Sequence, residues 1–473
     1  MHRPMRDLLR RVSRRTSLHM PATGGRAPLH GFAPYRWDTT ELPVTDDLYR
    51  PAGAIAQAEG LAARSAGAAA TLLLTGGSTA GVHAMLLYAC GRGGAVVLPR
   101  NAHLSTLNLC AVAGIEPVFA ETSFTAEGRL YTTPQAFACA LDARPDAAAV
   151  FALHGDYYGL YGDLPAIARE AHARGKLLLC DEAHGAYLNW RADLPNAGTR
   201  GADLFVQSAH KTLPALTAGA WLHAMAGVDV TRLRAMLRLV QTSSPSFITM
   251  LALDEARAWM DTRGRAACEA LARRLNRLRA QAAPLGYMDG QTNPPDGCRY
   301  DPLRLVLRAP EGGELLAERL AERGLDVEMS DGCHIVCILP LKGNRRVLTR
   351  LLGALRFTAW HRERLAVGDL PARDGAAEPP FRPPVWPPRH MPLSQAAFSA
   401  QEPVPPSQAV GRISAACVGR YPPGVAWLTP GDEVTSGVAD LICQTPPQRV
   451  FGLTQGGLLP CVPPRDAADR SND

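Results

Sequence analysis

The sequence predicts an α/β fold in which a mainly parallel sheet is flanked by helices and is followed by a small α+β C-terminal region. Short apolar runs typical of buried strands recur between residues 71 and 207, and helix-length segments separate them. This alternation is the pattern of βα units, whose helical crossovers return each strand parallel to the previous one. A chain of 473 residues can bury one large core and a second, smaller one.

The predicted strands are short and almost wholly apolar, as expected of strands that are covered on both faces. They are expected at 71–74, 95–99, near 115, and at 147–152, 177–180 and 202–207. Helices are predicted over 54–67, over 164–174 and over the arginine-rich segment 263–282. Strand-like runs at 303–307 and 335–339 predict the small α+β region, with Arg304 on the exposed face of the first run.

Changes in composition divide the chain into five predicted regions. Seven prolines fall between residues 371 and 388, which is typical of an extended connector. The regions are an N-terminal segment (1–50), a large domain (51–290), a small α+β domain (291–366), a proline-rich linker (367–406) and a C-terminal domain (407–473).

The composition favours a soluble cytoplasmic protein that binds neither nucleic acid nor membrane. Lys+Arg 50 against Asp+Glu 44 leaves a net charge of only +6, and the arginines near the N-terminus fit a solvated amphipathic helix. No apolar run reaches the roughly 18 residues of a membrane span. Eleven cysteines are scattered without metal-binding spacing, so we expect reduced thiols and no metal site.

A glycine-rich turn follows the first predicted strand. The segment 75–81 reads Thr-Gly-Gly-Ser-Thr-Ala-Gly and precedes a helix. Backbone N–H groups at a helix N-terminus, together with serine and threonine hydroxyls, form a cradle for phosphate. Gly77, Ser78 and Thr79 are the candidates, and the turn lacks the Gly-Lys-[Ser/Thr] ending of a nucleotide-binding loop.

An acid and a lysine end two later strands. Asp181 follows the run 177–180, and Lys211 lies in the polar cluster that follows 202–207. A site for pyridoxal 5′-phosphate (PLP) needs such a pair, because the amine bonds the aldehyde and the carboxylate keeps the pyridine nitrogen protonated. Ligands of open α/β sheets bind at the carboxyl ends of strands, so these residues should meet the phosphate turn and His103 in one crevice.

The sequence around this pair resembles that of a known family. Asp181-Glu-Ala-His-Gly-Ala186 and Gln207-Ser-Ala-His-Lys-Thr212 resemble the bacterial ornithine/lysine/arginine decarboxylases, fold-type-I PLP enzymes, in their short form. Similar segments run from about His19 to Asp432. The resemblance implies a lyase of polyamine metabolism: a homodimer that decarboxylates ornithine, lysine or arginine to the corresponding amine and CO₂.

The resemblance also implies roles for individual residues. Lys211 would carry the cofactor and Asp181 would pair with its pyridine nitrogen, while His103 would stack on the ring and the Ala183 methyl would pack on the opposite face. His184 would orient the groups around Asp181. The phosphate would be held by Gly77, Ser78, Thr79, Ser208 and His210, with Thr242 or Ser243 supplied by a neighbouring subunit.

Two departures from the family pattern leave the substrate open. Ala22-Thr23-Gly24 stands where the family has Gly-His-Lys, and Ala416 stands where an acid is common. Glu41 is then the remaining acidic candidate for the distal cation of the substrate, so we expect weak discrimination among the three amino acids. Other fold-type-I chemistry, such as transamination or aldol cleavage, remains an alternative, as does a catalytically weak PLP-binding partner subunit.

Overall fold

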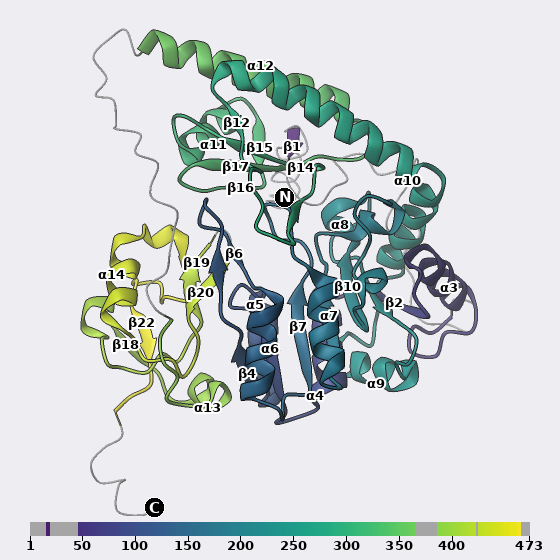
Figure 1. Cartoon of the computed structure of the whole chain (residues 1–473), viewed down its shortest axis with the longest axis vertical. Coiled ribbons are helices and arrows are strands. Elements are labelled where there is room, and N and C mark those ends of the chain that lie inside the picture. The colour runs from purple at the N-terminus through teal and green to yellow at the C-terminus, as the bar shows by residue number, and fades with distance from the viewer. Residues whose placement is uncertain (1–15, 19–45, 366–385, 422–423, 465–473) are drawn as a thin grey trace, which may run out of the picture. The chain divides into compact units, whose positions relative to one another are not determined.

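The computed structural model describes residues 16–18, 46–365, 386–421 and 424–464 (Figure 1). Within them, seven strands form a sheet in the order β2-β11-β10-β9-β7-β3-β4. Neighbouring pairs β9/β10, β3/β7 and β3/β4 are parallel, whereas β11 runs antiparallel to both β2 and β10. The predicted α/β class with a mainly parallel sheet is therefore confirmed.

The strands of this sheet lie close to the predicted runs. Their bounds are β2 (Ala70–Leu74), β3 (Ala95–Leu98), β4 (Glu116–Phe119), β7 (Ala149–Leu153), β9 (Leu177–Asp181), β10 (Leu204–Ser208) and β11 (Ala220–Ala224). Every residue of β3, β10 and β11 is buried, which explains why apolar runs rather than alternating patterns marked the first two. Strand β11 was not predicted, because its sequence Ala-Trp-Leu-His-Ala includes a histidine and no β-branched residue.

The chain packs into two compact units, each built from separate segments. Among the described residues, the first contains 16–18, 46–85, 153–169 and 178–365, and the second contains 86–152, 170–177, 386–421 and 424–464. The five regions that composition suggests remain a prediction.

The first unit also contains helices and a second, antiparallel sheet. Its helices are α3 (Ala54–Ala66), α8 (Ala209–Thr212), α9 (Val230–Val240), α10 (Phe247–Ala282), α11 (Gly313–Glu322) and α12 (Asn344–Leu365). The sheet has the order β12-β14-β17-β16, with bounds Met288–Asp289, Arg304–Arg308, His334–Ile338 and Met329–Ser330. A further strand, β15 (Leu325–Val327), pairs in parallel with β1 (Thr16–Leu18). This sheet and α11 form the α+β region that the sequence predicted.

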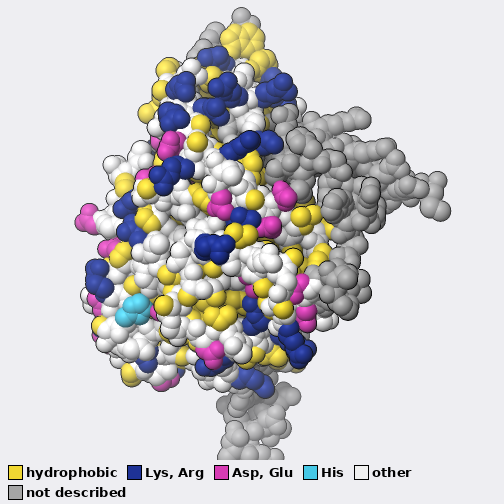
Figure 2. Space-filling model, turned by 90° about the vertical axis from the view of Figure 1, so that its right-hand side faces the viewer, with side chains coloured by type: hydrophobic (Ala, Val, Ile, Leu, Met, Phe, Trp, Pro, Cys, Tyr) yellow, Lys and Arg dark blue, Asp and Glu magenta, His cyan; other side chains and the backbone are white. Residues whose placement is uncertain are grey.

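Helix α10 begins 16 residues before the predicted start at residue 263. Ser246 caps it, since the Ser246 hydroxyl accepts the N–H of Thr249 at 3.2 Å. The added turns bury Met250, Leu253 and Met260, while four arginines of the later turns are exposed. Figure 2 shows Lys and Arg side chains gathered toward the end where Figure 1 places α10 and α12. Exposed arginines of these two helices are Arg263, Arg265, Arg273, Arg277, Arg345, Arg346, Arg350 and Arg356.

The second unit contains strands β3 and β4, helices α5 (Leu104–Ala113) and α6 (Pro134–Ala143), and a C-terminal group of short elements. That group packs around Val418, Trp427 and Val434, all fully buried. It contains α13 (Leu393–Phe398), α14 (Ser436–Gln444), β18 (Glu402–Val404), β19 (Val418–Arg420), β20 (Val425–Leu428), β21 (Val450–Phe451) and β22 (Leu459–Cys461). Residues 386–406 thus hold a helix and a strand, where the proline content predicted an extended connector.

Two helices contribute residues to both units, α4 (Gly77–Cys90) and α7 (Leu164–Ala173). Their positions agree with the predicted helices after residue 81 and over 164–174. No helix in the described part of the chain is both long enough and apolar enough to cross a membrane.

Candidate active site

Lys211 lies on the single turn of α8, directly after β10, and its side chain is largely enclosed. Its Nζ lies 3.3 Å from Nε2 of His184, a buried residue of the loop after β9. Burial lowers the pKa of Lys211, because the ammonium form loses hydration; the carboxylates of Asp181 and Glu328 oppose this shift, and the Arg304 cation adds to it. A lysine with a lowered pKa is the form that can act as a nucleophile or accept a proton.

Asp181 is the last residue of β9, and its carboxylate is held by the loop that it begins. Its Oδ1 accepts the N–H of Ala183 at 2.9 Å, and the carbonyl of Ala183 in turn accepts the N–H of Ser208 at 3.3 Å. Only 8% of Asp181 is exposed. The parallel pairing of β9 and β10 therefore fixes the acid and the segment that leads to Lys211 against one another, as the sequence predicted.

The phosphate turn begins α4 as expected. Gly77 is the first helical residue and has φ +74°, a left-handed conformation that favours glycine, and a Cβ there would meet no heavy atom within 4 Å. Ser78 Oγ lies 2.8 Å from Ser208 Oγ, so two predicted phosphate ligands from distant parts of the sequence meet. At Gly81 a Cβ would lie 2.6 Å from Val206 Cγ2, so glycine allows α4 to approach β10 closely.

The same turn has a supporting residue that the sequence did not indicate. Gln241 Oε1 accepts the backbone N–H of Thr75 at 3.0 Å and that of Gly76 at 3.4 Å. Gln241 ends α9 and is separated by more than 160 residues from the turn, so only the tertiary structure joins them. The predicted donor Thr79 lies beside these groups in sequence and is exposed.

His210 is held by the backbone rather than by another side chain. Its Nδ1 donates to the carbonyl of Gly219 at 3.1 Å, and burial lowers its pKa. A phosphate dianion close to this ring would favour the protonated form, which could then donate from Nε2. The predicted phosphate role thus agrees with the position of His210 at the start of α8.

Arg304 enters the site from β14 and corrects the sequence prediction, which placed it on an exposed face. It is only 2% exposed, and its Nη2 lies 3.5 Å from Nδ1 of His184. The ring of Tyr157 contacts the other side of His184 edge-on, with centroids 4.6 Å apart. The imidazole is therefore enclosed by Lys211, Arg304 and Tyr157, and the last two were not predicted as site residues.

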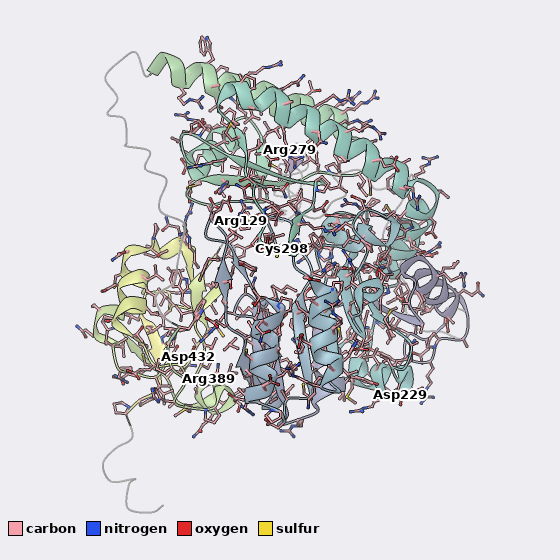
Figure 3. The ribbon with its side chains drawn as sticks, viewed as in Figure 1. Arg129, Asp229, Arg279, Cys298, Arg389 and Asp432 are labelled. Atoms are coloured by element: carbon pink, nitrogen blue, oxygen red, sulfur yellow. The ribbon has the colours of Figure 1, made fainter. Side chains whose placement is uncertain are left out.

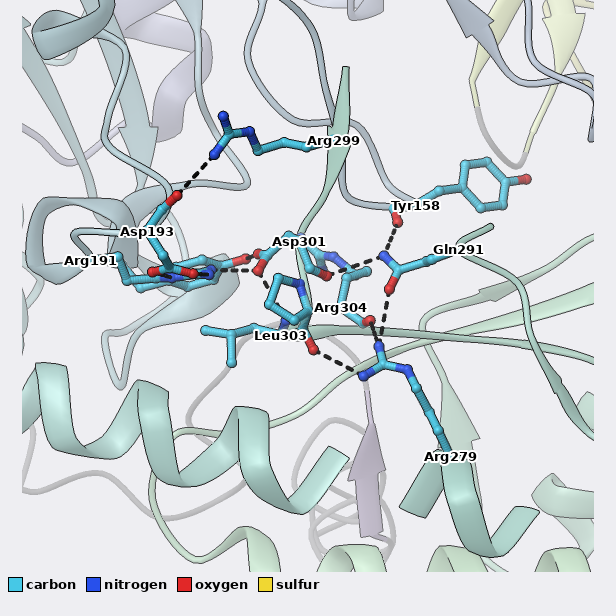
Figure 4. Close-up of polar contacts among 11 residues, drawn as sticks. Tyr158, Arg191, Asp193, Arg279, Gln291, Arg299, Asp301, Leu303 and Arg304 are labelled. Carbon is cyan, nitrogen blue, oxygen red and sulfur yellow. Dashed lines mark hydrogen bonds and ion pairs between the residues drawn. The ribbon is translucent and has the colours of Figure 1, made fainter. Parts of the chain in front are cut away.

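The backbone around Arg304 is fixed by a dense polar network (Figure 4). Asp301 Oδ1 accepts from Arg191 Nη1 at 2.5 Å, and the hydroxyl of Tyr187 donates to the other carboxylate oxygen. Arg279 Nη2 donates to the carbonyl of Arg304 at 2.7 Å and to Gln291 Oε1 at 3.0 Å. Because these groups come from the segment after β9, from α10 and from the loop after β12, the position of Arg304 is set by several elements.

The remaining predicted residues are in the second unit, at exposed positions of the first unit, or outside the described residues. His103 is exposed in the second unit, where its Nδ1 accepts the N–H of Ser105 at 3.2 Å and caps α5. Thr242 and Ser243 are exposed residues between α9 and α10. Glu41 and Ala22-Thr23-Gly24 lie outside the described residues. The cofactor role of His103, the partner-subunit role of Thr242 or Ser243 and the substrate role of Glu41 stay predictions.

The donor set fits PLP better than a metal ion. A lysine amine, a carboxylate at a neighbouring strand end and a glycine-rich helix N-terminus lined by two serine hydroxyls match the aldehyde, the pyridine nitrogen and the phosphate respectively. Among the described residues, no group of three or more His, Cys, Asp or Glu side chains could hold a metal ion. The fold and this set of residues define a fold-type-I PLP-dependent enzyme.

Comparison with known proteins identifies the family. The family model for "Orn/Lys/Arg decarboxylase, major domain" matches residues 29–293. The chain is 31% identical over 412 residues to the uncharacterized protein YaaO of Bacillus subtilis, covering 84% of this chain and 83% of the relative. It is 29% identical to the arginine decarboxylase of the same species, covering 84% and 82%. The chain belongs to the Orn/Lys/Arg decarboxylase family and is a PLP-dependent amino acid decarboxylase.

Solved structures agree on the fold. The constitutive lysine decarboxylase of E. coli superposes with a TM-score of 0.72 at 19% identity, covering 86% of this chain and 72% of that chain. Lysine decarboxylase A of Pseudomonas aeruginosa gives 0.74 at 18% identity, covering 97% and 82%.

Proposed function

We propose that this protein decarboxylates a basic amino acid, with arginine as the first substrate to test, and yields the corresponding amine and CO₂ in polyamine metabolism. The observation that carries the proposal is the juxtaposition of Lys211 with His184 and, at the neighbouring strand end, of Asp181. Curated relatives named arginine decarboxylase, at 29% and 28% identity, support arginine over the other two candidates. We further propose that the protein acts in the cytoplasm as a homodimer.

The side chains of the site divide the chemistry among them. PLP, when bound, accepts the electron pair that remains on the substrate when the bond to the carboxylate breaks. Asp181 would hold the proton on the pyridine nitrogen, which would keep the ring electron-poor. Lys211, which burial favours as a neutral amine, would hold the cofactor covalently; once released as an amine it would take up a proton and could return it to the substrate Cα. Burial of Asp181 and His184 excludes water, which strengthens each of these charge interactions.

Preference for a basic substrate requires a carboxylate other than Asp181, whose charge is paired with the cofactor. Glu328, between β15 and β16, is a second carboxylate whose charge acts on Lys211. A cationic substrate entering there gains an attraction that an uncharged amino acid lacks, because an unpaired buried cation is costly. Glu328 therefore joins Glu41 as a candidate for recognition of the distal cation. Specificity constants for arginine, lysine and ornithine are expected within about two orders of magnitude of one another.

The direct test measures ¹⁴CO₂ release from the three carboxyl-labelled amino acids by the holoenzyme. Glu328→Gln should lower kcat/KM for all three by roughly tenfold or more, the usual effect of losing a charge-assisted contact. Glu322→Gln, at an exposed position of α11, is the matched control and should leave the rates unchanged. Strong preference for an uncharged amino acid would contradict the substrate class, and formation of a keto acid without CO₂ would point to transamination instead.

A complementation experiment tests the homodimer. If Thr242 or Ser243 completes the site of a neighbouring subunit, Lys211→Ala and the double variant Thr242→Ala/Ser243→Ala should each be impaired. Mixed dimers of the two variants would contain one site with every native residue, and activity should rise toward about a quarter of the wild-type value. Mixtures that stay as inactive as their components, while light scattering shows dimers exchanging subunits, would contradict the shared site.

A further inference from the structure

Arg304 and Lys211 contact the two nitrogens of a single imidazole ring, that of His184. Arg304 Nη2 lies 3.5 Å from Nδ1, and Lys211 Nζ lies 3.3 Å from Nε2 of the same histidine. A neutral imidazole has one protonated nitrogen and one lone-pair nitrogen, so it cannot accept hydrogen bonds at both positions. The guanidinium is always a donor, because arginine stays protonated in proteins. Nδ1 is therefore the accepting nitrogen, and the ring proton is on Nε2.

We propose that Arg304 is a positioning residue for the decarboxylase reaction: by donating to Nδ1 it fixes the tautomer in which Nε2–H of His184 donates to the neutral amine of Lys211. An ammonium group on Lys211 would meet this N–H with its own protons, which is a repulsive arrangement. The Arg304–His184 contact thereby favours the uncharged lysine, the form that reacts with an aldehyde and accepts a proton. The inference rests on the proposed chemistry of Lys211, and it concerns the protein before cofactor or substrate is bound.

The surroundings of Arg304 fit a fixed donor rather than a mobile surface cation. The side chain is 2% exposed, and its Nε is buried with no hydrogen-bond partner. Its carbonyl is held by Arg279, and the Asp301 N-terminal to β14 is clamped by Arg191 and Tyr187 (Figure 4). Tyr157 packs against His184 and restricts rotation of the ring. The contacts just named hold the guanidinium of Arg304 and the imidazole of His184 in place, and none of these contacts involves Lys211.

Several charged groups act on Lys211 from the elements around it. Asp181 at the end of β9 and Glu328 between β15 and β16 favour its protonated form, while Arg304 on β14 disfavours it. His210, adjacent on α8, also interacts with the lysine charge. The charge of Arg304 acting directly and its effect transmitted through His184 would both lower the pKa of Lys211. The experiment must therefore separate the two.

The chain offers a favourable means of measurement, because it contains only three lysines: Lys176, Lys211 and Lys342. Cofactor-free protein is labelled with trace acetic anhydride between pH 7 and 10.5, and peptide mass spectrometry follows each lysine separately. Lys176 and Lys342 serve as internal references. Arg304→Met should decrease the neutral fraction of Lys211 at pH 8 about tenfold, equivalent to one pH unit in its midpoint. Arg308→Met, at an exposed position of the same strand, is the matched control and should change nothing.

A double-variant cycle distinguishes transmission through the ring from direct charge repulsion. In a His184→Gln background the side-chain amide can donate or accept, so no tautomer is enforced, and Arg304→Met should then change Lys211 labelling less than about threefold. His184→Gln alone should shift Lys211 in the same direction as Arg304→Met, which keeps the test available if the buried arginine variant does not fold. Equal effects of Arg304→Met in both backgrounds, or no effect in either, would overturn the proposal.

A direct contact between Arg304 and the substrate carboxylate is the competing role. It predicts a higher KM in Arg304→Lys with unchanged Lys211 labelling in cofactor-free protein, which would also overturn the inference. Failure of the decarboxylase function itself would look different, because Lys211 labelling would follow the predicted pattern while no amino acid released CO₂.

Discussion

Two buried clusters of charge in this protein have opposite character. In the second unit, Asp432 is completely buried and accepts four hydrogen bonds, from Arg100 Nη1 at 3.2 Å, Arg389 Nε at 3.4 Å, and Thr429 N and Oγ1 at 2.8 Å each. We call these residues the Arg–Asp cluster; Figure 3 labels Arg389 and Asp432. The guanidinium of Arg100 also lies 3.9 Å over the ring of Phe119. Every charge there has a bonded counter-charge, so removal of one partner would leave a buried charge uncompensated.

The site cluster of Lys211, Asp181, His184 and Arg304 is arranged differently. Lys211 and Arg304 both contact the neutral ring of His184, and Asp181 Oδ1 accepts a backbone N–H. The carboxylates of Asp181 and Glu328 are close enough to influence the pKa of Lys211. None of the hydrogen bonds described above joins either carboxylate directly to the lysine. Such an arrangement leaves the amine and the carboxylate available to a ligand. The comparison indicates that hydrogen-bond and ion-pair partners, rather than burial alone, distinguish a structural charge cluster from a catalytic one.

The largest expected effect comes from removing the reactive amine. Lys211→Ala should lower decarboxylation by at least about 10³-fold, because both the covalent anchor and the proton donor are lost. Borohydride reduction of holoenzyme followed by peptide mass spectrometry should find the cofactor on Lys211 in wild type and on no lysine in the variant. Lys176→Ala and Lys342→Ala are the controls. Cofactor trapped on either of those lysines in wild-type protein would contradict the site.

Asp181→Asn keeps the shape of the side chain but removes its negative charge. Activity should fall about 10³-fold, or about 4 kcal/mol of transition-state stabilisation, with PLP still bound. Steady-state kinetics and the absorbance of the bound cofactor give the two readouts. Asp203→Asn is the matched control, since Asp203 directly precedes the same β10 and its Oδ2 accepts the backbone N–H of Leu178 at 2.7 Å. Near-normal turnover in Asp181→Asn would remove the carboxylate from its proposed role.

Asp432→Ala tests the structural member of the comparison. The change leaves the buried Arg100 cation without its carboxylate, which should cost about 3–5 kcal/mol of unfolding free energy. Urea unfolding followed by circular dichroism measures this loss. Glu433→Gln breaks the exposed His390–Glu433 pair next to it and should cost less than about 1 kcal/mol. If Asp432→Ala were as stable as wild type, the Arg–Asp cluster would not stabilise the fold as its bonding indicates.

The smallest effect is expected at the phosphate turn. Ser78→Ala should weaken PLP binding by about tenfold, the effect of one charge-assisted hydrogen bond, and leave the unfolding free energy nearly unchanged. Because Ser78 and Ser208 contact each other, the double variant Ser78→Ala/Ser208→Ala should lose less affinity than the sum of the single losses. Dialysis with fluorescence detection of free PLP measures both. Strict additivity would indicate that the two hydroxyls act independently.

The sequence indicated most of the candidate residues that the structure brings together in the first unit. Asp181, Lys211 and Ser78 follow short apolar runs, and the carboxyl ends of parallel strands place such residues on one edge of a sheet. The supporting residues were not predictable in this way. Arg304 is a charged residue in a predicted strand, and the local sequence pattern predicted that its side chain would be exposed to solvent. Nothing in the local sequence around Gln241 indicates its contact with the phosphate turn, because an uncharged polar residue at a helix end is usual on any surface.

What the sequence alone determined is therefore the fold class and the order of most strands along the chain, and it proposed a set of candidate cofactor-binding residues, since these depend on hydrophobic period and on short motifs. The tertiary structure decided which distant groups support them: the antiparallel strand β11, the early start of α10, the glutamine under the phosphate turn and the buried arginine behind His184. The physical reason is that burial and hydrogen-bond partnership are set by residues more than 100 positions away, and no local pattern encodes which of them will meet.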